Sequence, residues 1–538
     1  MQNLTTCLMV SSPDVRGPFT QSQWRPTATI KKDWLWSYLI PKPKCLDAAG
    51  MHLIINSIRT LFPDAKDLVE ESAAPFPSIA RPRENKSYVL QTPAISENEG
   101  EISGVYRVHD KLFKRILEFK EYAERLVIVH GDHMTTAHMR SIIAAQLEAK
   151  DDYNRKGWML PVPAFFHIKL NFIEMIFRVF WDSFVSDDVQ FLGRSQHISR
   201  QKVKYHHALP LLQDAFRSRI LAFLIRELVD DGVLLDKDIS RKTVESALEG
   251  LGSTAIEEKL AGIHQQLLSP AGWTGLYKGQ DYIDLDFRSQ CRYLQTVRIL
   301  LVMVTAVHLG DYGVLRQLIP TLPTWFYGGG SSKYGPEMLY FAWLLHPEVT
   351  DSELSEGILR SGLVRCTTAG SQWKAIDLAL EHVNAAFAID IKNNKNSTHD
   401  VTSTFLRLAV VGPYTAAIRK GVERIFRTHQ DGKHTNPATN RDCIDYACLI
   451  YRNGRTRRRQ SGTPAHEPVD IRDIQREGMR LIINEKRDWF NSTVVRPAYQ
   501  ADYIALPGLA DEDDVIVESE EGDRLYGADD DLVESDYF

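Results

Sequence analysis

The residues with the clearest chemical potential follow a short apolar run in the first third of the chain. The segment "RLVIVHGDHMTTAHMRSII" (125–143) places Asp132 directly after a strand-like run and directly before a helical pattern. Its carboxylate either caps the following helix by accepting a hydrogen bond from a backbone N–H group, or it is a metal-binding carboxylate at the edge of a sheet. The sequence alone leaves both interpretations open.

Two further segments place polar side chains along one side of otherwise apolar helices. In "HIKLNFIEMIFRVFW" they recur at the spacing of one helical face, and they are His167, Asn171, Glu174 and Arg178. In "IDLALEHVNAAFAIDIK" the corresponding residues are Asp377, Glu381, Asn384 and Lys392. A helix that is apolar over most of its circumference is buried, so its polar side chains must be paired or line a cavity. We therefore consider interior ion pairs and, alternatively, a common polar site near Asp132.

Familiar catalytic motifs are absent from the sequence. The glycine-rich stretch "GGGSSKYG" lacks the preceding strand and the GK[ST] ending of a phosphate-binding loop, and there is no GxSxG or HExxH motif. Glu337, in "YGPEML", follows Pro336 and is expected in the first turn of a helix. The helix macrodipole favours an acid at that position without any catalytic role.

The elements that would position these residues follow from the hydrophobic pattern. A helical segment leads into the strand "LVIVHGD", a helix over about 135–150 and the apolar run "GWMLPVPAFFHI". Fully apolar strands in the order strand, helix, strand indicate a parallel pair in an α/β sheet. From about residue 167 to 430 the pattern is almost wholly helical. We predict a mostly helical α/β fold, in which a small parallel or mixed sheet carries a large helical insertion.

Composition and charge divide the chain into four predicted regions. Residues 1–110 form a partly irregular, Pro-rich N-terminal extension, and 111–440 form the α/β core. A basic C-terminal segment (441–510) precedes an acidic tail (511–538) that holds thirteen acids and one base. The net charge of the chain is −6, so the part before the tail carries +6. The tail has too little apolar surface to offset its ordering entropy and is predicted to be disordered.

A run of five arginines lies at the start of the basic segment, in "YRNGRTRRRQSGTP". It comprises Arg452, Arg455, Arg457, Arg458 and Arg459. Such a run binds the phosphate backbone of DNA, acts as a nuclear localisation signal or forms a solvated loop. The sequence does not decide among these alternatives, and it gives no indication of oligomeric state.

Two features predict an intracellular protein without a membrane span. The longest apolar stretch, "ILLVMVTAV" (299–307), is much shorter than a membrane span requires and predicts a buried helix. The N-terminus has no basic region followed by a continuous apolar run, which argues against a secretory signal. The six cysteines are scattered without zinc-site spacing, so we interpret them as reduced structural thiols.

Four segments carry a family resemblance. They are "VIVHGDHMTTAHMRS", "GWMLPVPAFFHIKLNF", "KYGPEML" and "IDLALEHVNAAFAIDIK". Together, in order and rough spacing, they resemble a family of fungal proteins that carry a domain of unknown function, over about residues 1–500. Those proteins look similar to transposon-encoded proteins, which suggests a relationship to DDE-type transposases with a ribonuclease H-like fold.

The resemblance implies phosphodiester cleavage and strand transfer with two Mg²⁺ ions held by three carboxylates. Asp132 matches the second acid, at the end of its strand. The third acid would be Glu381 or, as the alternative, Glu337, and His167 resembles a histidine that often follows the next strand. Asn171, Glu174, Arg178, Asp377 and Asn384 would then support these groups.

The departure from the family pattern concerns the first acid. The pattern has an Asp-Asn element on a strand upstream of a segment similar to "MQNLTTCLMV", and this chain starts at that Met1. Asp14 and Asp33 lie in segments broken by proline or rich in aromatic residues. We therefore expect the first acid to be missing, through a truncated gene model or domestication. The sequence predicts a degenerate transposase-like protein with little or no nuclease activity, or a noncatalytic DNA-associated or protein-interaction scaffold.

Overall fold

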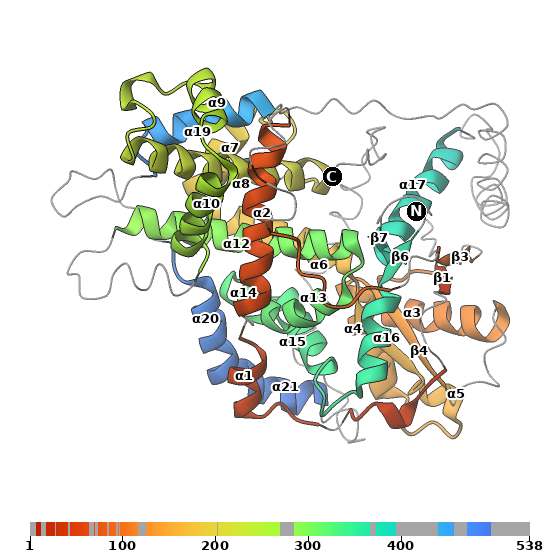
Figure 1. Cartoon of the computed structure of the whole chain (residues 1–538). Coiled ribbons are helices and arrows are strands. Elements are labelled where there is room, and N and C mark those ends of the chain that lie inside the picture. Colours follow the sequence, from red (N-terminus) through yellow and green to blue (C-terminus); the bar gives the residue numbers. More distant parts are fainter. Residues whose placement is uncertain are drawn as a thin grey trace.

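A three-stranded sheet, at the lower right of Figure 1, carries the segment that ends in Asp132. In this computed structural model, β4 (Arg125–Gly131) pairs in parallel with β5 (Met159–Pro163), in register from Val127 opposite Met159 to Gly131 opposite Pro163. The short β2 (Phe19–Thr20) pairs antiparallel with the first residues of β4. The predicted strand, helix, strand unit with a parallel pair is therefore confirmed.

The structure describes most of the chain. The described residues are 7–11, 18–26, 28–40, 43–63, 69, 74–82, 86–92, 95, 97–116, 125–201, 203–269, 284–365, 373–393, 440–456 and 471–495. The predicted acidic tail (511–538) and three arginines of the basic run, Arg457, Arg458 and Arg459, lie outside these residues.

The connection between the two parallel strands runs through α4 (His133–Ala145) and the short α5 (Asp152–Arg155). The helix α4 starts two residues before the expected start at about 135 and ends five residues before the expected end at about 150. All five residues of β5 are buried, as its uninterrupted apolar sequence predicts. The next helix, α6 (Phe165–Phe180), begins two residues after β5 ends. Both connections therefore place helix N-termini at the carboxyl edge of the sheet.

The other regular elements of the described structure are helices and two small antiparallel strand pairs. These pairs join β1 (Leu8–Ser11) to β3 (Tyr88–Gln91) and β6 (Leu363–Arg365) to β7 (Trp373–Ala375). The remaining α-helices are α1 (Lys32–Tyr38), α2 (Pro43–Leu61), α3 (Ile102–His109), α7 (Ser186–Phe191), α8 (Tyr205–Asp230), α9 (Arg241–Glu249), α10 (Ser253–Leu267), α12 (Leu285–Leu309), α13 (Tyr312–Leu318), α14 (Leu322–Gly328), α15 (Tyr334–Leu344), α16 (Ser352–Ser361), α17 (Ile376–Asn393), α19 (Asn440–Arg452), α20 (Ile474–Leu481) and α21 (Arg487–Phe490). The predicted mostly helical α/β architecture is confirmed at this level, but it does not show a ribonuclease H-like fold.

The helix α12 lies in the centre of the main core. It is long and apolar enough to cross a membrane by length and composition alone, but 72% of its apolar window is buried inside the protein. It contains the stretch "ILLVMVTAV", so the buried helix expected there is confirmed. Such burial is what the core helix of a globular protein requires. It ends at Gly310, whose φ of 69° is the left-handed conformation that glycine adopts most readily.

The predicted regions at both ends of the core prove to be packed into it. The helix α2, from the supposed N-terminal extension, contacts α8, α10 and α12, and its Ile54 and Ile58 are fully buried in the main hydrophobic cluster. The helix α19, at the start of the supposed basic segment, packs along α8. Helices on either side of residues 110 and 440 therefore contribute to one hydrophobic cluster. The division of the chain into four regions stays a prediction.

Candidate functional site

Asp132 lies at the carboxyl end of β4 and is the N-cap of α4. Its Oδ1 accepts a hydrogen bond from the backbone N–H of Thr135 at 2.8 Å. This bond satisfies one of the N–H groups that the first turn of a helix leaves without an intrahelical partner. The helix-cap interpretation of this carboxylate is confirmed, and the half-buried side chain lies at the edge of the sheet where a functional carboxylate was also expected.

Asp377 and His167 meet at the start of α6. The N-cap of this helix, Ala164, has no side chain that can accept a hydrogen bond, and Asp377 on the first turn of α17 does so instead. Its carboxylate accepts the backbone N–H groups of Phe166 (3.1 Å) and His167 (3.0 Å), and lies 3.1 Å from His167 Nδ1. A cap from a distant segment thus joins α17 to the edge of the sheet.

The charges of this group shift the pKa values of its members. Burial alone would lower the pKa of His167, but the hydrogen bond to Asp377 and the charges of Asp377, Asp132 and Glu381 raise it to about 9. Burial would raise the pKa of Asp377, yet its bonds to His167 hold it below the usual range. The imidazole is therefore protonated at neutral pH, in an ion pair with a carboxylate that is only 7% exposed.

Glu381 belongs to the same electrostatic group. Its pKa is raised, first by burial and then by the negative charges of Asp377 and Asp132, while His167 opposes the shift. Asp132 at the end of β4, His167 on α6 and Glu381 on α17 therefore interact across one small region, although they lie far apart in the sequence. A catalytic or metal-binding role of these residues stays a prediction.

Glu337 lies beside this group but is neutralised by a partner that the sequence analysis missed. It is in the first turn of α15, as predicted, and only 1% exposed. Both carboxylate oxygens accept hydrogen bonds from the Arg140 guanidinium, and Thr136 Oγ1 donates to Oε2 at 3.1 Å. Arg140 also lies over the ring of Tyr340, 4.5 Å from its centroid. Asp132, Thr136 and Arg140 recur at steps of four along α4, and this spacing was a readable signal.

His130 is a second histidine at this edge that the sequence analysis left unassigned. Its Nε2 lies 2.9 Å from Ser361 Oγ, and that hydroxyl donates to the carbonyl of Ile358. The hydroxyl proton is therefore used, so His130 carries its proton on Nε2 and donates it to Ser361. Burial lowers the pKa of His130 to about 4, so this ring is neutral where His167 is charged.

The other polar residues of the two stripes have different surroundings. Asn171 donates to the backbone carbonyl of His167 at 3.0 Å and so stays local. Glu174 and Arg178 are exposed, and Arg178 donates to the carbonyl of Gly329 and to Ser331 Oγ. Asn384 is half-buried two turns after Asp377 on α17. The residues of the two stripes that contact each other are His167 and Asp377, at the N-terminal ends of α6 and α17.

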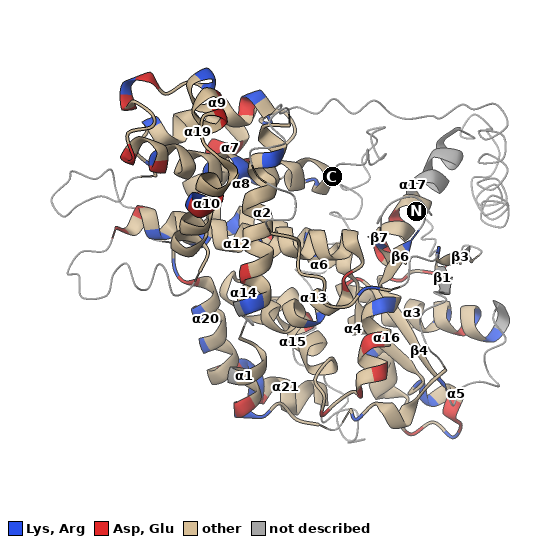
Figure 2. Ribbon diagram, in the orientation of Figure 1, with Lys and Arg blue, Asp and Glu red and all other residues tan. Residues whose placement is uncertain are grey.

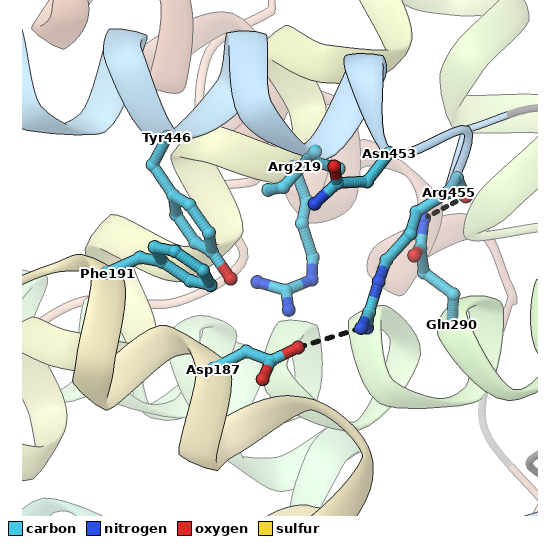
Figure 3. A pocket seen from close by; sticks show the side chains of 8 residues that line it. Asp187, Phe191, Arg219, Gln290, Tyr446, Asn453 and Arg455 are labelled. Atoms are coloured by element: carbon cyan, nitrogen blue, oxygen red, sulfur yellow. Dashed lines mark hydrogen bonds and ion pairs between the residues drawn. The ribbon is translucent and has the colours of Figure 1, made fainter.

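The described part of the arginine run has structural partners. Arg452 donates to the carbonyl of Ile239, and Arg455 forms an ion pair with Asp187 at 2.8 Å. Figure 3 shows this ion pair at a small polar pocket, where Arg219 also points inward beside Tyr446. The space there is about 10 Å³, enough for roughly one water molecule. The two arginines thus hold the end of α19 in place, and their predicted contact with nucleic acid stays a prediction.

A family model matches residues 23–434, which is most of the chain and includes the whole candidate site. The chain belongs to DUF6589, a family of unknown function. No curated protein and no solved structure matches the chain. The resemblance to a family with a domain of unknown function is therefore confirmed, while the predicted fungal origin and relation to transposases gain no support from these comparisons.

The described residues of this DUF6589 member do not fit a magnesium site as they stand. Mg²⁺ prefers six oxygen ligands in nearly octahedral geometry. Among the described residues, no three His, Cys, Asp or Glu side chains are grouped so that they could hold a metal ion. Both oxygens of Asp377 and of Glu337 already accept protein hydrogen bonds, and Oδ1 of Asp132 caps α4. The local chemistry is that of a buried ion-pair network which ties three helix N-termini to the edge of a sheet.

Proposed function

We propose that this chain is a transposon-derived, transposase-like protein of the DDE type with little or no nuclease activity, and that it associates with DNA. The observation that carries the proposal is the position of Asp132. It directly follows the parallel strand β4, and its charge acts on Glu381 and His167, which come from two other elements. A nuclease of this type needs acids from strand ends and from a later helix to converge in one place.

The carboxylate oxygens of Glu337 and Asp377 already accept protein hydrogen bonds, and this supports a degenerate site. Glu337, the alternative third acid, is held by Arg140 and Thr136, and a positively charged guanidinium at its oxygens opposes a second cation. Asp377 is held in the same way by His167 and two backbone N–H groups. The strand that would supply the first acid has no counterpart among the three strands of this sheet, because β2 and β5 end in no acid.

A plasmid-nicking assay tests the proposed loss of activity. Supercoiled DNA is incubated with the full chain and Mg²⁺ or Mn²⁺, beside Asp132→Ala and the control Asp152→Ala, which removes an exposed carboxylate of α5 that pairs with Arg155. We expect the wild type to nick DNA barely above background, with any residual activity absent from Asp132→Ala and kept in Asp152→Ala. Rapid turnover by the wild type would contradict the degenerate state. Residual nicking that is equal in all three proteins would contradict a role of Asp132 in the reaction.

A noncatalytic scaffold is the second candidate function. The observation that favours it is the ion-pair network itself, because the carboxylates of Asp132, Glu337 and Asp377 each stabilise a helix terminus or an interhelical contact. In that case DNA or a protein partner binds elsewhere on the chain. Replacing Asp132 would then change stability but neither nicking nor metal binding.

A further inference from the structure

The helix α20 presents arginines to solvent at regular spacing. It lies after the residues that the family model matches, and it packs against α14 through Ile474, Gly478 and Met479. On its outer side Arg476 and Arg480 are exposed, and Arg472 is exposed just before the N-cap, Asp473. Figure 2 shows basic positions along α20, at the lower left of the view. The exposed row thus comprises two arginines on one side of α20, Arg476 and Arg480, and Arg472 just before the helix.

The backbone contact between α20 and α14 fixes the direction of this row. A Cβ atom on Gly478 would lie 1.7 Å from the carbonyl oxygen of Thr324, and one on Gly328 would lie 1.7 Å from that of Ile474. The two helices therefore touch at glycines, where no larger residue fits. A contact this close leaves α20 little freedom to rotate, so its outer face is presented by a rigid element.

One acid lies within the row and partly neutralises it. Arg480 binds Glu477 through two hydrogen bonds of 3.0 and 2.7 Å. That pairing, followed by the charges of Arg480 and Arg472, lowers the pKa of Glu477. The side chain of Arg476 forms no ion pair with any residue that the structure describes. The row therefore holds three arginines and one carboxylate, and the charge of Glu485 also acts on Arg480, so the uncompensated positive charge is that of Arg472 and Arg476.

We propose that Arg472, Arg476 and Arg480 form a docking surface for the phosphate backbone of DNA. This inference rests on the DNA association proposed above and names the surface that provides it. The planar guanidinium of arginine donates two parallel hydrogen bonds to a phosphate group, which lysine cannot do. Arg476 and Arg480 are separated by about 6 Å along the helix. Duplex DNA carries one charge per roughly 1.7 Å of its axis, so each arginine of the row has a phosphate within reach.

The test uses the full chain and a duplex of about 25 base pairs without a chosen sequence, with affinity measured by fluorescence anisotropy between about 50 and 200 mM salt. The variant R472Q/R476Q/R480Q is compared with wild type. Each lost phosphate contact lowers the salt slope by about 0.9, so we expect a slope smaller by about 2 to 3 and an affinity at least tenfold lower at low salt. The matched control R200Q/R441Q removes two exposed arginines that also form surface ion pairs, and it should change far less.

Glu477→Gln gives a test of opposite sign. It removes a negative charge from the row and releases Arg480, so binding to DNA should become several-fold tighter with a steeper salt dependence. No loss of folding explains a gain in affinity, so this arm stays informative if an arginine variant is unstable. Thermal unfolding of each variant is recorded to confirm that its midpoint matches that of wild type.

The outcomes separate this inference from the proposed function. Failure of the wild type to bind DNA at low salt would overturn both. Normal binding by the triple arginine variant, with weaker binding by the control, would overturn the α20 surface alone. A peptide of residues 511–538 serves as the acidic protein competitor. If the triple variant loses affinity for this peptide but not for DNA, the row recognises acidic protein, and the nucleic-acid proposal is wrong.

Discussion

Replacing Asp377 by asparagine should destabilise the protein severely, because this one carboxylate completes the N-terminus of α6. It accepts two backbone N–H groups and the His167 imidazole while it is 7% exposed. An asparagine oxygen can accept one of these donors, but its NH₂ group then faces the others. Hydrogen bonds to a charged group contribute about 1.5 to 3 kcal/mol each, so we expect a loss of about 3 to 5 kcal/mol at pH 7.

The same variant should also lose a pH dependence that wild type shows. The pKa of His167 is about 9 in the folded chain, against an ordinary value of 6.5. A raised pKa means that the folded state holds the proton more tightly, so this stabilisation is complete below pH 6.5 and disappears as the pH rises through 9. A shift of this size corresponds to about 3 kcal/mol. In Asp377→Asn the partner charge is gone, and burial then keeps the imidazole neutral.

Urea titrations of both proteins at pH 6.5 and pH 9.5, followed by tryptophan fluorescence, measure these effects. The control is Asp351→Asn, which changes the exposed N-cap of α16, where asparagine caps as well as aspartate does. Wild type and the control should both lose stability between the two pH values, and Asp377→Asn should start lower and change little. A stability of Asp377→Asn within about 1 kcal/mol of the control at pH 6.5 would refute the capping argument. An unchanged pH dependence in that variant would refute the assigned ion pair.

Two further predictions concern the neighbours of this group. Arg140→Met leaves the Glu337 carboxylate buried without its ion-pair partner, so urea titration should show a loss of about 3 to 5 kcal/mol in the free energy of unfolding. The double variant Arg140→Met/Glu337→Met should recover much of this loss. Equal losses in the single and the double variant would contradict the pairing. Asp132→Ala should cost about 1 kcal/mol through loss of the α4 cap, whereas Asp132→Ser should retain most of that stability. If serine and alanine destabilise equally, the bond to Thr135 does not contribute as the structure indicates.

The sequence predicted the features that depend on residues close together in the chain. The apolar runs around Ile128 and Leu160 sufficed to predict a parallel strand pair, and β5 is buried along its whole length as its lack of polar alternation predicts, whereas β4 is only half-buried. The position of Asp132 before a helical pattern gave the capping bond as one of two interpretations, and the structure confirms that bond. The apolar stretch within α12 predicted a buried helix for the same reason, since its residues have no polar face to offer to solvent.

The partners across the fold could not be predicted in the same way. Nothing near Ala164 indicates that the missing cap of α6 comes from Asp377, because that contact depends on how α17 packs against the sheet. The spacing of polar residues along α4 indicated that Arg140 shares a face with Asp132 and Thr136. It did not indicate that α15, which carries Glu337, packs against that face. Arg455 shows the converse, since a residue in a basic run can be held by one acid, Asp187, that a distant helix supplies.

Manganese binding measured by electron paramagnetic resonance tests the central claim most directly, which is that the carboxylates around Asp132 form a degenerate site that does not hold a metal ion. The full-length wild type is titrated with Mn²⁺ beside Asp132→Ala, Glu381→Gln and the surface control Asp152→Ala. We predict that all four proteins bind Mn²⁺ equally weakly, because protein donors already occupy oxygens of Asp132, Glu337 and Asp377. A Mn²⁺ site in the wild type whose affinity falls in both Asp132→Ala and Glu381→Gln and is unchanged in Asp152→Ala would contradict the claim.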